Sequence, residues 1–365
     1  MKRSLFLLVA FLLVLLACAR LVVSTPVFKS TPINQSLSTL TVYSGVKYTP
    51  TRPLITPSIW VPVTKQPTTG GQIARQHILA LSETIRPRVA GSPQEAEAAR
   101  YIQTVLQEQG YTVQLQLFDT EDDGGKASLR SVSRFSQNAI AVKSGQSTRE
   151  IIVGAHYDSV EVGRGADDNA SGVGVMLELA EMIQGAPTPY TVRFIAFGAE
   201  EIGLKGSSYY VKHMSALELQ NTVAMVNLDS LIAGDITYVY GTTRPEGVLR
   251  DWILKKALSH GFEMQTQSGA ELDLPDGSPC DCSDYAPFEH AGIPFVYFEA
   301  TNWNLGKQDG YTQVDLRYGV QGEIWHTKFD NLDYIDQTFP GRIDDHLSLF
   351  VTLLYETLTQ FVTSP

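Results

Sequence analysis

The chain of 365 residues is 43% hydrophobic and carries a formal net charge of −11 at pH 7. This length allows one large domain with additional segments, and the apolar content is enough for a sizeable core. The acidic balance argues against a nucleic acid partner, because phosphate groups require basic surface.

The chain begins with the features of an export signal. Residues 1–3 are basic, and the apolar stretch 5–16 is short for a membrane-spanning helix. The stretch ends in Leu-Leu-Ala-Cys, which resembles a bacterial lipobox, so we predict a lipoprotein-type signal peptide over residues 1–18 with lipidation at Cys18. The alternatives are an ordinary signal peptide with a chance cysteine and an uncleaved anchor. We expect an exported protein, either secreted or held in the cell envelope by the lipid anchor alone.

Residues 19–70 are rich in Ser, Thr and Pro, which is typical of an extended tether between an anchor and a domain. Apart from Cys18, the sequence contains Cys280 and Cys282. An exported protein can keep a disulfide between these two cysteines, although a bond across one residue is strained. Two free thiols or weak metal ligands are the alternative interpretation.

From residue 71 to residue 365 the pattern alternates between helices and strands. Helical spacing or start signals mark residues 72–85, 93–110, 171–183, 207–214, 247–259 and 343–361. Residues 111–118 alternate as a half-buried strand, and four continuous apolar runs predict strands buried on both faces, 151–155, 192–197, 223–228 and 293–298. The sequence therefore predicts one α/β domain, a three-layer sandwich with a mixed, largely parallel central sheet.

Three of the predicted strands end directly in residues that can bind metal, namely His156, the pair Glu200-Glu201 and Asp229. Ligands bind at the carboxyl ends of strands in open α/β sheets, so these distant positions converge. With His326 and one of the adjacent Asp167 and Asp168, the chain offers two imidazoles and three carboxylates, which can hold two zinc ions if one carboxylate bridges them. One further glutamate is left to activate water. The sequence thus predicts metal-assisted hydrolysis.

Each of these motifs is weak alone. A histidine at a strand end is more often structural, and the adjacent Asp167 and Asp168 also suit the start of a helix. The pair Glu200-Glu201 is the sharpest signal, because two acids directly after an apolar strand are costly without a role. The other histidines lack such neighbours and are interpreted as packing or surface residues.

Together, the motifs resemble peptidase family M28, the two-zinc peptidases that include bacterial aminopeptidases. The resemblance covers residues from about 72 to the C-terminus, and its motifs are His156-x-Asp158-Ser159, Gly165-Ala166-Asp167-Asp168-Asn169-x-Ser171-Gly172, Ala199-Glu200-Glu201-x-Gly203, Asn227-Leu228-Asp229, and Ser283-Asp284 followed by Ala291-Gly292-Ile293-Pro294. The resemblance implies that Asp168 bridges two zinc ions. His156 and Asp229 complete one zinc site, and Glu201 and His326 complete the other.

The resemblance also implies that Glu200 is the general base and that Asp158 orients the ring of His156. A cis peptide bond between Asp168 and Asn169 is a further family feature. This chain departs from the family where Ser-Asp-His becomes Ser283-Asp284-Tyr285, which leaves the oxyanion-stabilising residue open. Asp284 and Tyr285 are candidate substrate-binding residues, and a purely structural tyrosine is the alternative.

Within the family, residues 299–306 and 340–343 resemble the branch that releases N-terminal arginine. We therefore expect a monomeric aminopeptidase domain acting on the N-termini of peptides or proteins. The acidic segment 271–284 is a hypothetical receptor for a basic side chain. The alternative functions are a zinc-dependent glutaminyl cyclotransferase and a catalytically inactive binding module on the same fold.

Overall fold

A computed structural model describes residues 70–121, 135–242, 248–266, 281–308 and 310–363. The predicted signal peptide with Cys18, residues 19–69 of the predicted tether, and Cys280 lie outside these ranges. Among the described helices, none combines the length and the apolar content needed to cross a membrane.

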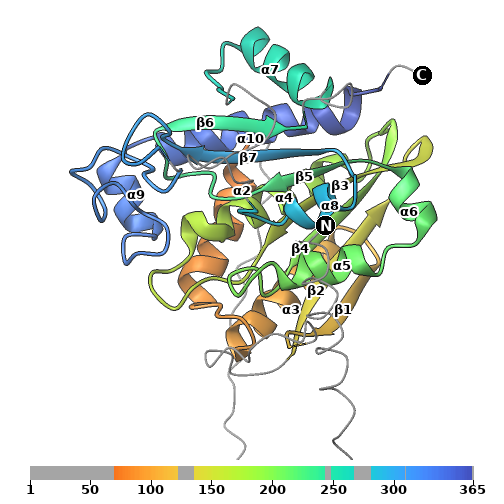
Figure 1. The fold of residues 1–365 in the computed structure, drawn as a ribbon, viewed down its shortest axis with the longest axis horizontal. Coiled ribbons are helices and arrows are strands. Elements are labelled where there is room, and N and C mark those ends of the chain that lie inside the picture. Colours follow the sequence, from red (N-terminus) through yellow and green to blue (C-terminus); the bar gives the residue numbers. More distant parts are fainter. Residues whose placement is uncertain (1–69, 122–134, 243–247, 267–280, 309, 364–365) are drawn as a thin grey trace, which may run out of the picture. The chain divides into compact units, whose positions relative to one another are not determined.

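A seven-stranded mixed sheet forms the centre of the described fold (Figure 1). Its order in space is β1-β2-β4-β3-β5-β7-β6. The neighbours among β4, β3, β5 and β7 pair in parallel, and the pairs β1–β2, β2–β4 and β6–β7 are antiparallel. The strands are β1 (Val113–Asp119), β2 (Phe135–Lys143), β3 (Ser147–His156), β4 (Tyr190–Phe197), β5 (Thr222–Leu228), β6 (Ile236–Gly241) and β7 (Phe295–Thr301).

Helices pack on both faces of this sheet. Along β3, Ile151 and Val153 join the larger core with residues of α2, α3, α4, α7 and α10, whereas Ile152 joins the smaller core with residues of α5 and α8. This alternation follows from the two-residue period of a strand. The helices are α2 (Gln72–Leu79), α3 (Pro93–Glu108), α4 (Gly172–Ile183), α5 (Lys205–Lys212), α6 (Ala216–Asn221), α7 (Val248–His260), α8 (Ala286–His290), α9 (Leu332–Thr338) and α10 (Arg342–Gln360).

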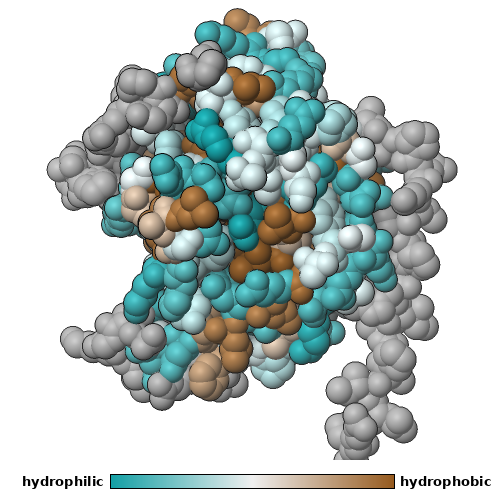
Figure 2. All heavy atoms as spheres, turned by 90° about the vertical axis from the view of Figure 1, so that its right-hand side faces the viewer, coloured by the Kyte–Doolittle hydropathy of each residue, from teal (hydrophilic) through white to brown (hydrophobic). Residues whose placement is uncertain are grey.

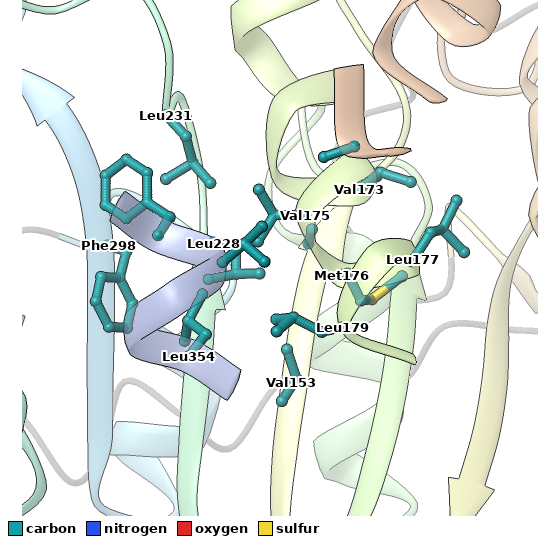
Figure 3. Close-up of a cluster of buried hydrophobic side chains, with 14 of the residues drawn as sticks. Val153, Val173, Val175, Met176, Leu177, Leu179, Leu228, Leu231, Phe298 and Leu354 are labelled. Atoms are coloured by element: carbon teal, nitrogen blue, oxygen red, sulfur yellow. The ribbon is translucent and has the colours of Figure 1, made fainter. Parts of the chain in front are cut away.

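Helix α4 is buried on nearly all sides, as expected for a helix in the middle of a core. Figure 3 shows Val175 and Leu179 of this helix among Val153 and Leu228 of the sheet and Leu354 of α10. Full burial of one such side chain stabilises the fold by roughly 1.5–3 kcal/mol. The core thereby fixes the start of α4, which directly follows the motif around Asp168.

The three-layer α/β sandwich predicted from the sequence is confirmed, and the predicted strands match β1, β3, β4, β5 and β7. Strands β2 and β6, at or near the two ends of the sheet, were not predicted. The helix predicted over residues 72–85 ends its regular part at Leu79, and the π-helical turn Ala80–Thr84 continues it.

Large apolar side chains also remain exposed, among them Leu117, Phe135 and Leu258. On the face shown in Figure 2, hydrophobic residues gather among hydrophilic ones. Apolar surface of this kind is normal for folded proteins, so the predicted monomeric state stays a prediction.

Candidate metal centre

The candidate ligands gather at the carboxyl ends of the parallel strands. His156 is the last residue of β3, and Asp229 directly follows β5. Glu201 lies in the loop after β4, Asp168 in the turn before α4, and His326 in the loop between β7 and α9. The fold therefore brings together all five side chains that the sequence predicts as zinc ligands.

Asp168 stands between the two histidines. Its Oδ1 lies 3.1 Å from Nε2 of His156, and its Oδ2 lies 3.0 Å from Nε2 of His326. Burial alone would raise the pKa of Asp168, but the hydrogen bonds from both histidines outweigh it and lower this pKa. The peptide bond between Asp168 and Asn169 is cis, as the family resemblance implied. A carboxylate with one oxygen toward each imidazole has the arrangement of a bridging ligand.

Each histidine has a second carboxylate of its own. Asp229 Oδ1 lies 3.4 Å from His156 Nε2, and Glu201 Oε2 lies 3.0 Å from His326 Nε2. Ligands about 2.0–2.2 Å from a tetrahedral zinc ion are themselves about 3.3 Å apart, so these separations suit zinc coordination. His156, Asp168 and Glu201 also offer donor atoms that all lie within 4.8 Å of one another. The residues present therefore fit zinc.

Asp167, the neighbour of Asp168, has no ion pair with either histidine in the described part of the chain and instead accepts hydrogen bonds from other groups. Its Oδ1 accepts hydrogen bonds from the backbone N–H groups of Ile232 and Ala233, and its Oδ2 accepts one from Nε2 of Gln313. The carboxylate is thus saturated by structural partners. This separates Asp167 from Asp168, two residues that the sequence pattern alone could not separate.

Glu200 lies next to the candidate ligands but farther from a histidine than they do. Its Oε2 is 4.0 Å from His156 Nε2, whereas the neighbouring Glu201 lies at 3.0 Å from its own histidine. The Glu200 side chain is 12% exposed. Burial raises its pKa well above the ordinary value, the charge of His156 opposes this shift, and the charge of Glu201 adds to it. A carboxyl group with a raised pKa is a better proton acceptor than an ordinary carboxylate.

Asp158 accepts hydrogen bonds from backbone N–H groups rather than from the ring of His156. Its two oxygens accept hydrogen bonds from the N–H groups of Glu200 and Glu201, at 3.0 and 3.2 Å. Its separation from Nδ1 of His156 is 3.6 Å, which is longer than a hydrogen bond. The role implied by the family, orientation of His156, stays a prediction, and the structure adds support of the loop that carries Glu200.

Ser283 is a residue of the site that the sequence did not single out. Its hydroxyl donates to Oδ2 of Asp229 at 2.6 Å and accepts a hydrogen bond from Nδ2 of Asn227 at 2.8 Å. All three residues belong to the family motifs given above. Their place in those motifs is the signal from which this contact could have been predicted. This chain of hydrogen bonds fixes the rotamer of one candidate ligand.

Comparison with known proteins agrees with this geometry. The family model "Peptidase family M28" matches residues 138–351. The chain belongs to peptidase family M28. It is 38% identical over 282 residues to the alkaline phosphatase isozyme conversion protein of Escherichia coli, covering 70% of this chain and 81% of that protein. It is 32% identical over 241 residues to aminopeptidase YwaD of Bacillus subtilis, covering 61% of this chain and 45% of that protein.

Solved structures share the fold of this M28 chain. The zinc aminopeptidase BSAP from Bacillus subtilis superposes with a TM-score of 0.61 at 22% identity, covering 81% of this chain and 97% of that one. Porphyromonas gingivalis glutaminyl cyclase superposes with a TM-score of 0.58 at 19% identity, covering 79% of this chain and 97% of that one. At these identities the likeness shows the fold. Family membership makes the protein a zinc-dependent hydrolase, as the sequence predicts.

Asp284 and Tyr285 of this M28 domain are both buried. The ring of Tyr285 stacks on Phe295 and Tyr297. Burial raises the pKa of Asp284 to about 7, against the opposing charge of His156. Contact of Asp284 and Tyr285 with substrate stays a prediction.

Cys282 is disulfide-bonded. The predicted bond to Cys280 involves a residue outside the described ranges, so this pairing stays a prediction. The predicted acidic receptor segment also lies largely there, since only residues 281–284 of it are described.

Arg88 is fully buried and donates hydrogen bonds to main-chain carbonyl groups. Its guanidinium donates to the carbonyl oxygens of Leu81, Tyr157, Arg164 and Gly165, at 2.7 to 3.1 Å. Three of these carbonyls, those of Tyr157, Arg164 and Gly165, lie between His156 and Asp168 in the chain. A planar fork of donors can satisfy this spread of acceptors, whereas an ammonium group cannot.

Arg88→Lys is therefore expected to destabilise the domain by about 2–4 kcal/mol, because several buried carbonyls lose their donor. Arg100→Lys is the matched control, since Arg100 is exposed on α3. Urea unfolding of the two variants tests this expectation. Equal unfolding midpoints for both variants would show that the buried guanidinium is dispensable.

The metal-free M28 domain binds extra protons in the folded state. Burial raises the pKa of Glu299 to about 8. The pKa of His326 rises to about 11 because Asp168 and Glu201 accept hydrogen bonds from it. Between pH 6.5 and 8 the folded state therefore holds more protons than the unfolded chain, and its stability must fall as the pH rises.

The melting temperature of the chelated protein is expected to fall from pH 6.5 to pH 8. Zinc displaces the protons of its ligands, so the stabilisation by zinc is expected to grow over the same interval. Thermal unfolding at both pH values, with chelator and with zinc, measures both trends. A metal-free melting temperature that rises with pH contradicts the assigned protonation of the site.

Proposed function

We propose that this protein is an exported two-zinc aminopeptidase that removes N-terminal residues, arginine among them, from peptides or proteins. One observation carries the proposal. The carboxylate of Asp168 presents one oxygen to His156 and the other to His326, and each histidine has its own second carboxylate. This arrangement supports two adjoining cation sites that share one ligand.

Zinc ions, when bound, polarise the scissile carbonyl and make a water molecule easier to deprotonate. Glu200 is the residue placed to accept the proton of that water, because its carboxylate lies next to the ligands without pairing closely with either histidine. The water oxygen attacks the carbonyl carbon as the proton leaves. The Glu200 carboxyl group then donates this proton to the leaving amine, which restores the base for the next cycle.

Two features support cleavage at the amino terminus. Relatives named as aminopeptidases align with this chain. The site is strongly acidic, which suits the cationic α-amino group of a peptide. The preference for arginine rests on the resemblance to the arginine-releasing branch and on the acidic segment 271–284.

Export and anchoring rest on the N-terminal sequence. A "Probable lipoprotein aminopeptidase LpqL" of Mycobacterium tuberculosis is 33% identical over 218 residues, covering 56% of this chain and 43% of that protein. This relative supports a lipidated Cys18 and a place in the cell envelope. Globomycin-sensitive processing and a mass increase at Cys18 test the anchor directly.

A glutaminyl cyclotransferase is the second candidate, because glutaminyl cyclases share the fold. The two activities differ in product, since the cyclase closes an N-terminal glutamine ring and leaves the peptide bond intact. The third candidate, an inactive binding module, would have no use for a complete set of ligands and a base. The full set, His156, Asp168, Glu201, Asp229 and Glu200, is present here.

Hydrolysis of aminoacyl-p-nitroanilides tests the proposal. We expect the zinc-loaded protein to release p-nitroaniline from the arginine substrate faster than from the lysine, leucine, alanine and glutamine substrates, and chelation to stop the reaction. Faster release from leucine would reject the arginine preference only. Cyclisation of glutaminyl peptides without hydrolysis of any substrate would reject the aminopeptidase itself.

A further inference from the structure

The buried carboxylate of Glu95 reaches from the first turn of α3 to the loop that carries the catalytic glutamates. Its Oε1 accepts a hydrogen bond from the backbone N–H of Ala199 at 3.1 Å and one from the hydroxyl of Ser136 at 2.6 Å. Its Oε2 accepts one from the N–H of Gly91 at 2.6 Å. Glu95 is 2% exposed. These three partners are all donors, so this position requires two acceptor oxygens.

Glu95 and Asp158 together bind three consecutive amides. The N–H of Ala199 goes to Glu95, and the next two, of Glu200 and Glu201, go to the two oxygens of Asp158. Two carboxylates from different parts of the chain thus hold the whole backbone from which the base and a ligand project. Glu200 and Glu201 are adjacent but have different roles, so the backbone between them must be held in place. A small shift of this backbone would move at least one of the two side chains out of position.

Ala199 has the backbone conformation that most needs this support. Its φ is +56°, in the left-handed region that an alanine rarely adopts. Its side chain is fully buried, and its N–H is held by Glu95. Without that acceptor, the residue loses a contact that offsets the cost of the left-handed conformation, and the loop can relax to another shape.

We propose that Glu95 is a positioning residue of the peptidase, which keeps Ala199 left-handed and so places Glu200 for proton transfer. This inference rests on the proposed function of Glu200. The segment that supplies Glu95 precedes residues 138–351, the part matched by the family model. Support for the catalytic loop therefore comes from outside the region that carries the family motifs.

The local sequence around Glu95 is also compatible with a second role, capping of α3. Ser92-Pro93-Gln94-Glu95 has the form of a capping box, in which the glutamate binds the N–H of the serine. Ser92 does cap α3 by accepting from the N–H of Glu95, at 3.1 Å. The carboxylate of Glu95 is instead directed to Gly91, Ser136 and Ala199. A capping role alone does not account for these contacts.

Glu95→Gln is the first test, with Glu97→Gln as the matched control, because Glu97 is exposed on the same helix. Glutamine offers one acceptor oxygen to two backbone donors on opposite sides, so either Ala199 or Gly91 loses its acceptor. We expect kcat toward the best substrate to fall about tenfold or more, with KM and zinc content near those of the wild type. Amide hydrogen exchange over residues 198–204 is expected to speed up in Glu95→Gln only.

A rescue variant separates positioning from general damage. Glycine adopts the left-handed conformation without the cost that alanine bears, so Glu95→Gln with Ala199→Gly is expected to recover several-fold in kcat. Glu95→Asp, which keeps the charge but is one methylene shorter, serves if the glutamine variant does not fold. An unchanged kcat and unchanged exchange over 198–204 overturn the inference, as does a loss that Glu97→Gln shares. An inactive wild-type protein would instead reject the proposed function.

Discussion

Glu200→Gln is expected to lower kcat by about two to four orders of magnitude, because the amide can neither take the proton from water nor return it to the leaving amine. Zinc binding is expected to stay intact. The carboxylate of Glu200 lies 4.0 Å from His156. His156 lies closer to Asp229, and His326 has Glu201 as its close partner. Steady-state kinetics and the zinc content of the same preparation measure the two effects together.

Glu201→Gln is the informative comparison, since it removes the carboxylate at 3.0 Å from His326. We expect this variant to lose zinc and activity together. If Glu200→Gln loses zinc while Glu201→Gln keeps it, the roles of the two glutamates are exchanged. If Glu200→Gln keeps full activity, another group is the base.

Asp168→Asn is expected to lower the zinc affinity of both positions by at least about 100-fold. The reason is geometric, because the two oxygens of Asp168 face different histidines. Loss of a residue that only supports a ligand lowers metal affinity by up to about 100-fold, and loss of the ligand itself should have at least that effect. Loss of His326, as in His326→Ala, is expected to affect one position and leave the one at His156 occupied. Zinc titration followed by calorimetry distinguishes a loss of two sites from a loss of one.

Glu161→Gln is the control for the asparagine variant, because Glu161 is exposed in the loop between His156 and Asp168. It should bind zinc like the wild type. Equal loss of one ion in Asp168→Asn and in His326→Ala would mean that Asp168 serves a single site, and the bridging role would fail.

The strand ends of this site could be predicted because burial and polarity change abruptly there. The apolar run before His156 and the one before Glu200 predict parallel strands in the interior, and parallel strands place their carboxyl ends together. Strand β2 was missed because its polar residues Ser136 and Asn138 are buried. Their side chains bond Glu95 and the carbonyl oxygen of Gly206, partners that are distant in sequence.

The residues that support the ligands could not be assigned from the sequence for a related reason. Arg88, Glu95 and Asp158 all act on main-chain groups, and any residue offers a main-chain N–H or C=O. Sequence motifs report which side chains recur, and the resemblance therefore supplied the candidate ligands. Their backbone partners depend on how distant loops meet in the folded domain.

The number of zinc ions that activate one chain tests the proposed two-zinc site most directly. Metal-free protein would be titrated with zinc, and bound metal and hydrolysis of the arginine substrate would be measured at each step. The arrangement around Asp168 predicts two ions per chain, with full activity reached only when both are bound. Full activity and saturation at one ion per chain would contradict the two-zinc site.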